Sequence, residues 1–218
     1  PFAILDTILQ TTDAFVAVDS GIDFPQLDVL WSVDNRPASG TIANGEIGTS
    51  SFTVINNRPT ILILGDAAAD TDEFDEHVIS HEFGHYFENS LGRSDSIGGQ
   101  HSLSARLDPR LAFGEGWGNA LAGIISGQVY RDSFNNSTQD FGFDLENNNF
   151  GTAGWYGEGS VQSILYDVMD SNTDGADTIS AGLAPIYRTF ISQAYKDIDP
   201  ATSIFSFSSF LRSEAGVN

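Results

Sequence analysis

The sequence contains no cysteine, few basic residues and no long apolar run, and each absence excludes a class of protein. Without cysteine there are no disulfide bonds and no thiolate metal ligands, so a metal would have to be held by His, Asp or Glu. Nine Lys and Arg against 30 Asp and Glu give a formal net charge of −21. Such a charge repels nucleic acid and anionic lipid, so we expect neither as a partner, and we expect no membrane insertion.

The composition is that of a folded protein. Hydrophobic residues make up 40% and aromatic residues 11% of 218 residues, enough for the core of one domain. The first residues show no hydrophobic signal core. We therefore expect a soluble, mature or trimmed form of a secreted, extracellular or periplasmic protein, with its oligomeric state left open.

Strand patterns come first along the chain and helix patterns follow. After a helical rhythm over residues 1–20, strands are predicted at 27–33, 49–54 and 60–65. Further helices are predicted at 114–127, 159–170, 183–195 and 203–216, with long loops at 93–109 and 131–154. This order predicts an α+β fold in a single domain, with a small twisted sheet over a central helix (1–91) and a mainly helical part (92–218).

The central helix is predicted at residues 70–92, where acidic residues suit the start of a helix and a glycine suits its end. Its apolar residues fall on two sides: Ile79, Phe83, Tyr86 and Phe87 on one, and Phe74 and Val78, with His81 and His85, on the other. A helix buried on two sides runs through the middle of a molecule.

The segment SHEFGHYFE (80–88) places two histidines one helical turn apart. The imidazoles of His81 and His85 then leave the same face and can reach a single ion. The carboxylate of Glu82 can touch a water on that ion without binding it, which is the H-E-x-x-H arrangement of zinc hydrolases. The competing interpretation is an ordinary helix with two surface or capping histidines.

A catalytic zinc site needs a third protein ligand, and Glu115 is the best candidate. It lies among Gly114, Gly116 and Gly118, which would allow another helix to approach closely. A glutamate in this mostly apolar segment is costly unless it meets a cation. Asn119 lies one turn further along, where it could hold a ring nitrogen of His81.

These segments resemble a known family. HEFGHYFE followed by GEGWGNALAG is similar to the gluzincin metallopeptidases of the fungalysin and thermolysin-like group, and WYGEGSVQSILYDVMD resembles the fungalysin helix that closes the site. The resemblance implies a zincin-like fold and a zinc endopeptidase acting on a peptide or protein. It implies His81, His85 and Glu115 as ligands and Glu82 as the general base.

The sequence departs from this family in two places. Asn119 replaces the usual aspartate, and no histidine follows His101, although the family uses a downstream histidine to stabilise the oxyanion. Tyr156 is the nominee for that role, with Tyr187 and His101 as rivals. The predicted strand 49–54 is the candidate edge for an extended peptide.

Other interpretations stay open. A dead site would make the chain a zincin-fold binding module, and a different substrate would make it a metallohydrolase of a non-peptide amide. His77 is predicted to face solvent. Calcium is an open alternative for two acidic segments, 70–76 and 170–178, although the second lacks the glutamate that closes an EF-hand loop.

Overall fold

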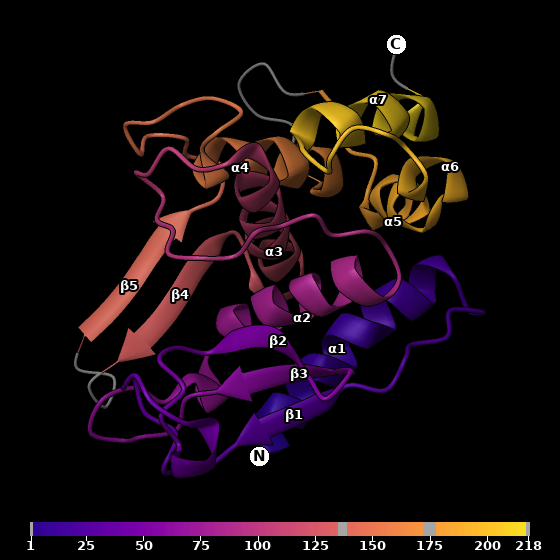
Figure 1. Cartoon of the computed structure of the whole chain (residues 1–218). Coiled ribbons are helices and arrows are strands. Elements are labelled where there is room, and N and C mark those ends of the chain that lie inside the picture. The colour runs from indigo at the N-terminus through magenta and orange to yellow at the C-terminus, as the bar shows by residue number, and fades with distance from the viewer. Residues whose placement is uncertain (1, 135–138, 172–177, 217–218) are drawn as a thin grey trace.

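The computed structural model describes residues 2–134, 139–171 and 178–216 (Figure 1). The first part contains α1 (Phe2–Val18), β1 (Asp28–Trp31), η1 (Ile42–Asn44), β2 (Ser51–Ile55), β3 (Arg58–Ile63), η2 (Asp72–Phe74) and α2 (Glu76–Ser90). The second contains α3 (Pro109–Ser126), β4 (Val129–Phe134), β5 (Gln139–Asp144), α4 (Glu158–Met169), α5 (Leu183–Ile191), α6 (Gln193–Lys196) and α7 (Ile204–Ala215). The α+β class is confirmed.

A three-stranded sheet covers one side of α2 (Figure 1). The buried strand β3 lies in its centre, parallel to β1 and antiparallel to β2. Asn56 and Asn57, with φ of 51° and 62°, form the turn between β2 and β3, and two positive φ angles are what a two-residue hairpin turn of type I′ requires. In this order β2 is an edge strand.

Helix α2 runs through the core, between the sheet, α1 and α3 (Figure 1). Eleven of its 15 residues are buried. It meets α3 at two glycines, where a Cβ atom on Gly84 would lie 3.1 Å from the Cα atom of Gly118. The absence of side chains there allows the two backbones to touch, which brings side chains of α2 and α3 within reach of each other.

One hydrophobic core includes residues from most of the helices and from the sheet. Phe15 of α1 stacks on Phe87 of α2 at a centroid distance of 4.3 Å. Trp117 of α3 lies 4.7 Å from Phe190 of α5, which lies 4.6 Å from Phe207 of α7. These aromatic contacts hold α2 against α1, and α3 against α5 and α7.

Several predicted boundaries were wrong. The central helix begins at Glu76 instead of residue 70, because Asp75 has an extended backbone and the preceding residues form η2. Phe74 therefore lies outside α2 and is 69% exposed. Helix α3 starts earlier than predicted, at Pro109, where the Asp108 side chain accepts a hydrogen bond from the Arg110 backbone N–H.

Two other predictions were wrong in kind. The expected loop at 131–154 contains most of the antiparallel hairpin of β4 and β5, so the second part of the chain is not wholly helical. The expected helix at 183–195 is broken at Ser192, whose ψ of 124° is extended, into α5 and α6. Of the acidic segment 170–178, residues 172–177 lie outside the described part of the chain.

Candidate metal centre

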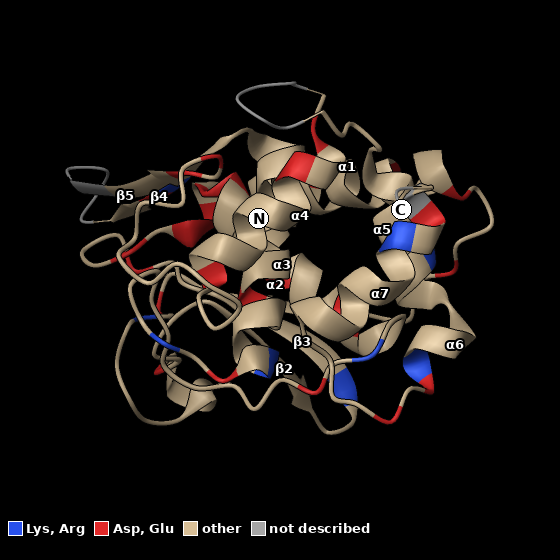
Figure 2. Cartoon of the chain, turned by 90° about the horizontal axis from the view of Figure 1, so that it is seen from above, with Lys and Arg blue, Asp and Glu red and all other residues tan. Residues whose placement is uncertain are grey.

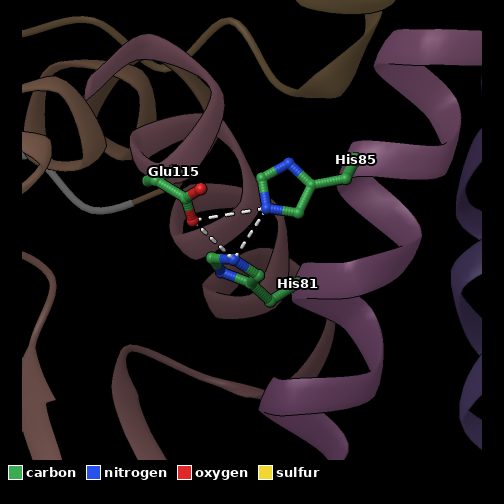
Figure 3. Close-up of side chains that lie close together, drawn as sticks. All are labelled: His81, His85 and Glu115. Atoms are coloured by element: carbon green, nitrogen blue, oxygen red, sulfur yellow. Dashed lines mark hydrogen bonds and ion pairs between the residues drawn. The ribbon is translucent and has the colours of Figure 1, made fainter. Parts of the chain in front are cut away.

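His81 and His85 of α2 meet Glu115 of α3 at a single point (Figure 3). Glu115 Oε2 lies 3.1 Å from His81 Nε2 and 3.3 Å from His85 Nε2, and the two Nε2 atoms are 3.0 Å apart. All three residues come from helices that touch at Gly84 and Gly118. The helix packing thus brings together the three residues that the sequence nominates.

The triangle has the size of one face of a tetrahedral zinc site. Zinc bonds of about 2.0 to 2.1 Å to nitrogen and oxygen place neighbouring ligand atoms about 3.3 Å apart. The three observed separations are 3.0, 3.1 and 3.3 Å. His, His and Glu are also the donor types of a catalytic zinc with one open position. These residues therefore fit a zinc ion, and their assignment as ligands stays a prediction.

The ring of His81 is held from two sides. Its Nδ1 atom lies 2.8 Å from Asn119 Oδ1, and the Asn119 amide donates a 2.9 Å hydrogen bond to Gln162 Oε1. The second contact fixes which Asn119 atom faces the ring, so Nδ1 carries the proton and Nε2 presents a lone pair. The predicted contact between Asn119 and His81 is therefore present. Gly118 lies against the flat side of the same ring.

The charged groups at the centre strongly shift one another's pKa values. Burial raises the pKa of Glu115, but the neighbouring His85 and His81 outweigh it and hold the pKa well below its ordinary value. Burial lowers the pKa of His85, but the Glu115 carboxylate outweighs it and raises the pKa to about 10. Glu115 is thus ionised in a site where it is 7% exposed, and it requires a cation beside it.

Glu82 is also buried, at 8% exposure, and the N–H of Phe52 on the edge strand β2 donates a 2.6 Å hydrogen bond to its Oε2. This contact ties the glutamate to the sheet and leaves Oε1 as its second acceptor. Burial raises the pKa of Glu82, and the histidines beside it lower it by less. A carboxylate with a raised pKa is suited to accept and release a proton near neutral pH.

His101 reaches the same centre from the loop between α2 and α3. Its Nε2 lies 3.3 Å from Glu115 Oε2, and its Nδ1 lies 2.8 Å from Glu158 Oε2. Burial lowers the pKa of His101, but the hydrogen bond to Glu158 and the charge of Glu115 outweigh it and raise the pKa. Glu158, the first residue of α4, is 3% exposed.

Glu158 was not predicted from the sequence as part of the site. The available signal was its Gly-Glu-Gly context at 157–159, which repeats the context of Glu115 at 114–116.

The structure places the other nominated residues elsewhere. The ring of Tyr156 packs under the guanidinium of Arg106 at 5.1 Å, and Tyr156 does not line either cavity beside Glu82. The hydroxyl of Tyr187 donates to Asp19 Oδ2 at 2.6 Å, in the core beside α1. Of the three residues nominated as the oxyanion donor, His101 lies nearest the centre, and the assignment of that role stays a prediction.

His77 was predicted to face solvent, and this prediction is wrong. It is 6% exposed, and its Nε2 lies 2.8 Å from the Gly127 carbonyl oxygen. Its ring lies 5.1 Å from that of Tyr130 on β4, so the hairpin covers this turn of α2. The prediction failed because the hairpin itself was not predicted.

Two cavities open beside the centre, and Glu82 and His101 line both of them. One, of about 460 Å³, extends towards the hairpin and has aromatic walls that include Tyr130, Phe141 and Phe143. The other, of about 370 Å³, runs along the edge strand β2 from Ser51 to Val54. An extended chain can thus cross the centre from one cavity to the other.

The sequence model of the Mycolysin C-terminal domain matches residues 50–212, about three quarters of the chain. The chain belongs to this family. It is a domain of mycolysin-type zinc metalloproteases, and the matched range includes His81, Glu82, His85 and Glu115. No curated protein and no solved structure matches the sequence. Assignment to the gluzincins in particular remains a prediction.

Proposed function

We propose that residues 1–218 form a single zincin-like catalytic domain, which acts as a zinc-dependent endopeptidase of gluzincin type. The observation that carries the proposal is the triangle of His81 Nε2, His85 Nε2 and Glu115 Oε2 with Glu82 beside it. Membership of a family of zinc metalloprotease domains supports the same reading. A structural metal site would gain nothing from a buried carboxylate such as Glu82 next to it.

His81, His85 and Glu115 would hold the ion. When bound, zinc supplies Lewis acidity towards the scissile carbonyl and lowers the pKa of water. Asn119 keeps the proton of His81 on Nδ1 and so keeps Nε2 available as a donor atom.

Glu82 is the general base. Its Oε2 is held by the Phe52 N–H, so Oε1 is left to take a proton from the attacking water. The same carboxyl group then delivers that proton to the nitrogen of the leaving amine. The pKa of Glu82, raised by burial, allows both transfers near neutral pH.

His101 stabilises the oxyanion that develops on the scissile carbonyl. Glu158 Oε2 accepts a hydrogen bond from the Nδ1–H of His101, so a protonated His101 directs its Nε2–H towards the centre. A donor aimed at a developing oxyanion contributes about 3 to 4 kcal/mol to the transition state.

The substrate is a peptide or protein in extended conformation. The Phe52 N–H points away from β3, and so does the Val54 N–H two residues on, because hydrogen-bonding groups alternate along an antiparallel strand. The Phe52 N–H is bound to Glu82, so the Val54 N–H is the donor left to pair with a peptide backbone of any sequence. Because the cavities continue on both sides of Glu82, a substrate can extend in both directions, as endopeptidase action requires.

The place of action is proposed to be outside the cell or in the periplasm. Mycolysin-type proteases are secreted. None of the helices in the described part of the chain is long and apolar enough to cross a membrane.

The test is cleavage of casein and of a quenched peptide library by the zinc-loaded chain, with and without a chelator, together with Glu82→Gln. We expect activity that the chelator removes and zinc restores. Glu82→Gln should lower kcat by about 10³-fold or more while zinc remains near one per chain, because the amide cannot take the proton. Glu76→Gln, the same change on the exposed first residue of α2, is the matched control and should remain active.

Each alternative has its own outcome. Zinc bound without cleavage of any peptide would indicate a zincin-fold binding module. Hydrolysis of small amides without cleavage of peptides would indicate a metallohydrolase of another substrate. Full zinc content after Glu115→Ala would refute the proposed third ligand.

A further inference from the structure

Four aspartates meet at a second point, beside β4. Asp70, Asp72, Asp75 and Asp132 each offer a carboxylate oxygen, and these four oxygens lie within 4.8 Å of one another. The first three come from the segment that leads into α2, and Asp132 comes from the hairpin. Acidic ribbon segments gather near β4 in Figure 2, whereas Lys and Arg are scattered.

No described Lys, Arg or His forms an ion pair with Asp70, Asp72 or Asp132. Burial is the main cause that raises the pKa of Asp72 to about 9 and that of Asp132 to about 7. Four carboxylates at this spacing repel one another unless protons or a cation neutralise them.

A buried oxygen without a donor points to a ligand at this place. Asp72 is 3% exposed, and its Oδ2 accepts a hydrogen bond from the Ser50 hydroxyl. Its Oδ1 is fully buried and accepts no hydrogen bond from a described residue. The Oδ1 atoms of Asp70 and Asp132 are also buried and accept no hydrogen bond from a described residue. Buried polar atoms are almost always satisfied, so three orphaned oxygens in one group require an explanation.

We propose that Asp70, Asp72, Asp75 and Asp132 bind a calcium ion. The site is distinct from the one built from His81, His85 and Glu115, and shares no residue with it.

The type and number of donor groups select calcium. Carboxylate oxygens are ligands for hard cations, whereas zinc prefers nitrogen or sulfur in its set. Calcium takes six to eight oxygen ligands and can be bound by several carboxylates of one protein, whereas magnesium usually keeps several waters and binds through one or two carboxylates. A group of four aspartates therefore suits calcium.

Neighbouring groups orient two of the carboxylates. The Ser50 hydroxyl, which donates to Asp72, accepts a 2.9 Å hydrogen bond from the Leu64 N–H. The backbone N–H of Ser133 donates to Asp75 Oδ2 at 3.0 Å, and the Ser133 hydroxyl donates to the same carboxylate. Such outer partners fix ligands in the geometry that an ion requires.

Bound calcium would join the hairpin to the start of α2. Asp132 lies two residues after Tyr130, whose ring lines the larger cavity together with Phe143 of β5. The ion would therefore hold the aromatic wall in place over the helix that carries His81. Calcium is expected to stabilise the fold and to order this wall, without touching the reacting atoms.

The test is thermal unfolding of the zinc-loaded chain after removal of calcium, with calcium or magnesium added at constant zinc. Calcium at 100 times its Kd should raise the melting temperature by about 5 to 10 °C, and magnesium should raise it much less. Binding is followed separately by terbium luminescence sensitised by Tyr130, with calcium as the competitor. Neither readout depends on peptide cleavage, so failure of the proposed activity would leave this test intact.

Asp132→Asn keeps the shape of the side chain and removes one charge. It should weaken calcium binding by roughly tenfold or more. In calcium-free buffer it should melt above the native chain, because one repelling charge is gone. Asp13→Asn, on the exposed side of α1, is the control and should behave as the native chain does.

Three results would overturn the proposal. One is a melting temperature that does not change with millimolar calcium. Another is an equal calcium response in Asp132→Asn and the native chain. The third is an absence of any calcium effect combined with a change in cleavage beside Arg or Lys in Asp132→Asn, which would mean that the aspartates receive a cationic side chain of the substrate.

Discussion

Gly118→Ala tests whether the packing of α3 against His81 sets the metal affinity. A Cβ atom at position 118 would lie 2.8 Å from His81 Nδ1 and 2.9 Å from Cε1, where ordinary contacts begin at about 3.4 Å. The ring would therefore have to move by roughly 0.6 Å. That shift is about three times the 0.2 Å tolerance of metal–ligand distances.

We expect zinc affinity to fall by about 10- to 100-fold, which corresponds to about 1.4 to 2.7 kcal/mol. The effect should not arise from unfolding. An alanine in a helix interior is favoured over glycine by about 0.5 to 1 kcal/mol, which offsets part of the strain from the displaced ring. The melting temperature of the metal-free Gly118→Ala chain should therefore stay near that of the native one.

The assay is a titration in which the protein competes for zinc with a chromophoric chelator whose own Kd for zinc is known. Gly123→Ala is the control on the same helix, because its Cβ would crowd Leu145 and Tyr166 instead of a nominated ligand. It should cost about 1 to 3 kcal/mol of stability and leave zinc affinity unchanged. Native zinc affinity in Gly118→Ala would refute the idea that His81 is positioned by this contact.

Three further substitutions separate the remaining roles. His101→Gln should lower kcat by about 100-fold with zinc content unchanged, and unaltered turnover would remove His101 from the mechanism. Tyr156→Phe should leave kcat within about twofold, and a large loss would return the oxyanion role to Tyr156. Burial raises the pKa of Glu88 from 4.5 to about 8, so the folded state loses stability as pH rises through this window. Glu88→Gln should therefore gain more in melting temperature over the native chain at pH 8 than at pH 5, and a constant difference would contradict the assignment.

The sequence predicts those contacts of the centre that depend on the spacing of residues along a single helix. The four-residue spacing of His81 and His85 fixes a shared face, and the same spacing relates Glu115 to Asn119. Glycines at 114, 116 and 118 indicated that a second helix comes close, and the observed contact of Gly118 with Gly84 is such an approach. Local periodicity therefore predicts which residues share a face on each helix, and the glycines predict that the two helices approach closely.

The parts that could not be predicted come from separate elements. His101 lies in a loop and Glu158 begins a helix 57 residues further on, so their contact depends on how the loop folds over α4. Tyr156 was nominated only two residues from Glu158, but the chain turns between them, and the tyrosine ring lies under Arg106. A motif indicates the neighbourhood of a residue and does not give the direction of its side chain.

The hairpin explains the remaining errors. Its second strand carries only two alternating aromatic residues, Phe141 and Phe143, separated by a glycine, and so short a pattern is weak evidence for a strand. With the hairpin unrecognised, His77 was predicted to face solvent, and the acidic segment before α2 was most simply read as a solvated helix start. In the structure β4 covers both and adds Asp132 to the aspartates.

Asn119 limits the number of negative charges that are buried around the candidate metal centre. Glu82, Glu115 and Glu158 already place three carboxylates around it, each no more than 8% exposed. A neutral amide fixes the tautomer of His81 as a carboxylate would, but adds no fourth charge to a buried site, where each uncompensated charge is costly. Its other end is bound to Gln162, which is also neutral and fully buried. On the proposed assignment, neutral groups orient His81, and the carboxylates are left for the metal, the attacking water and His101.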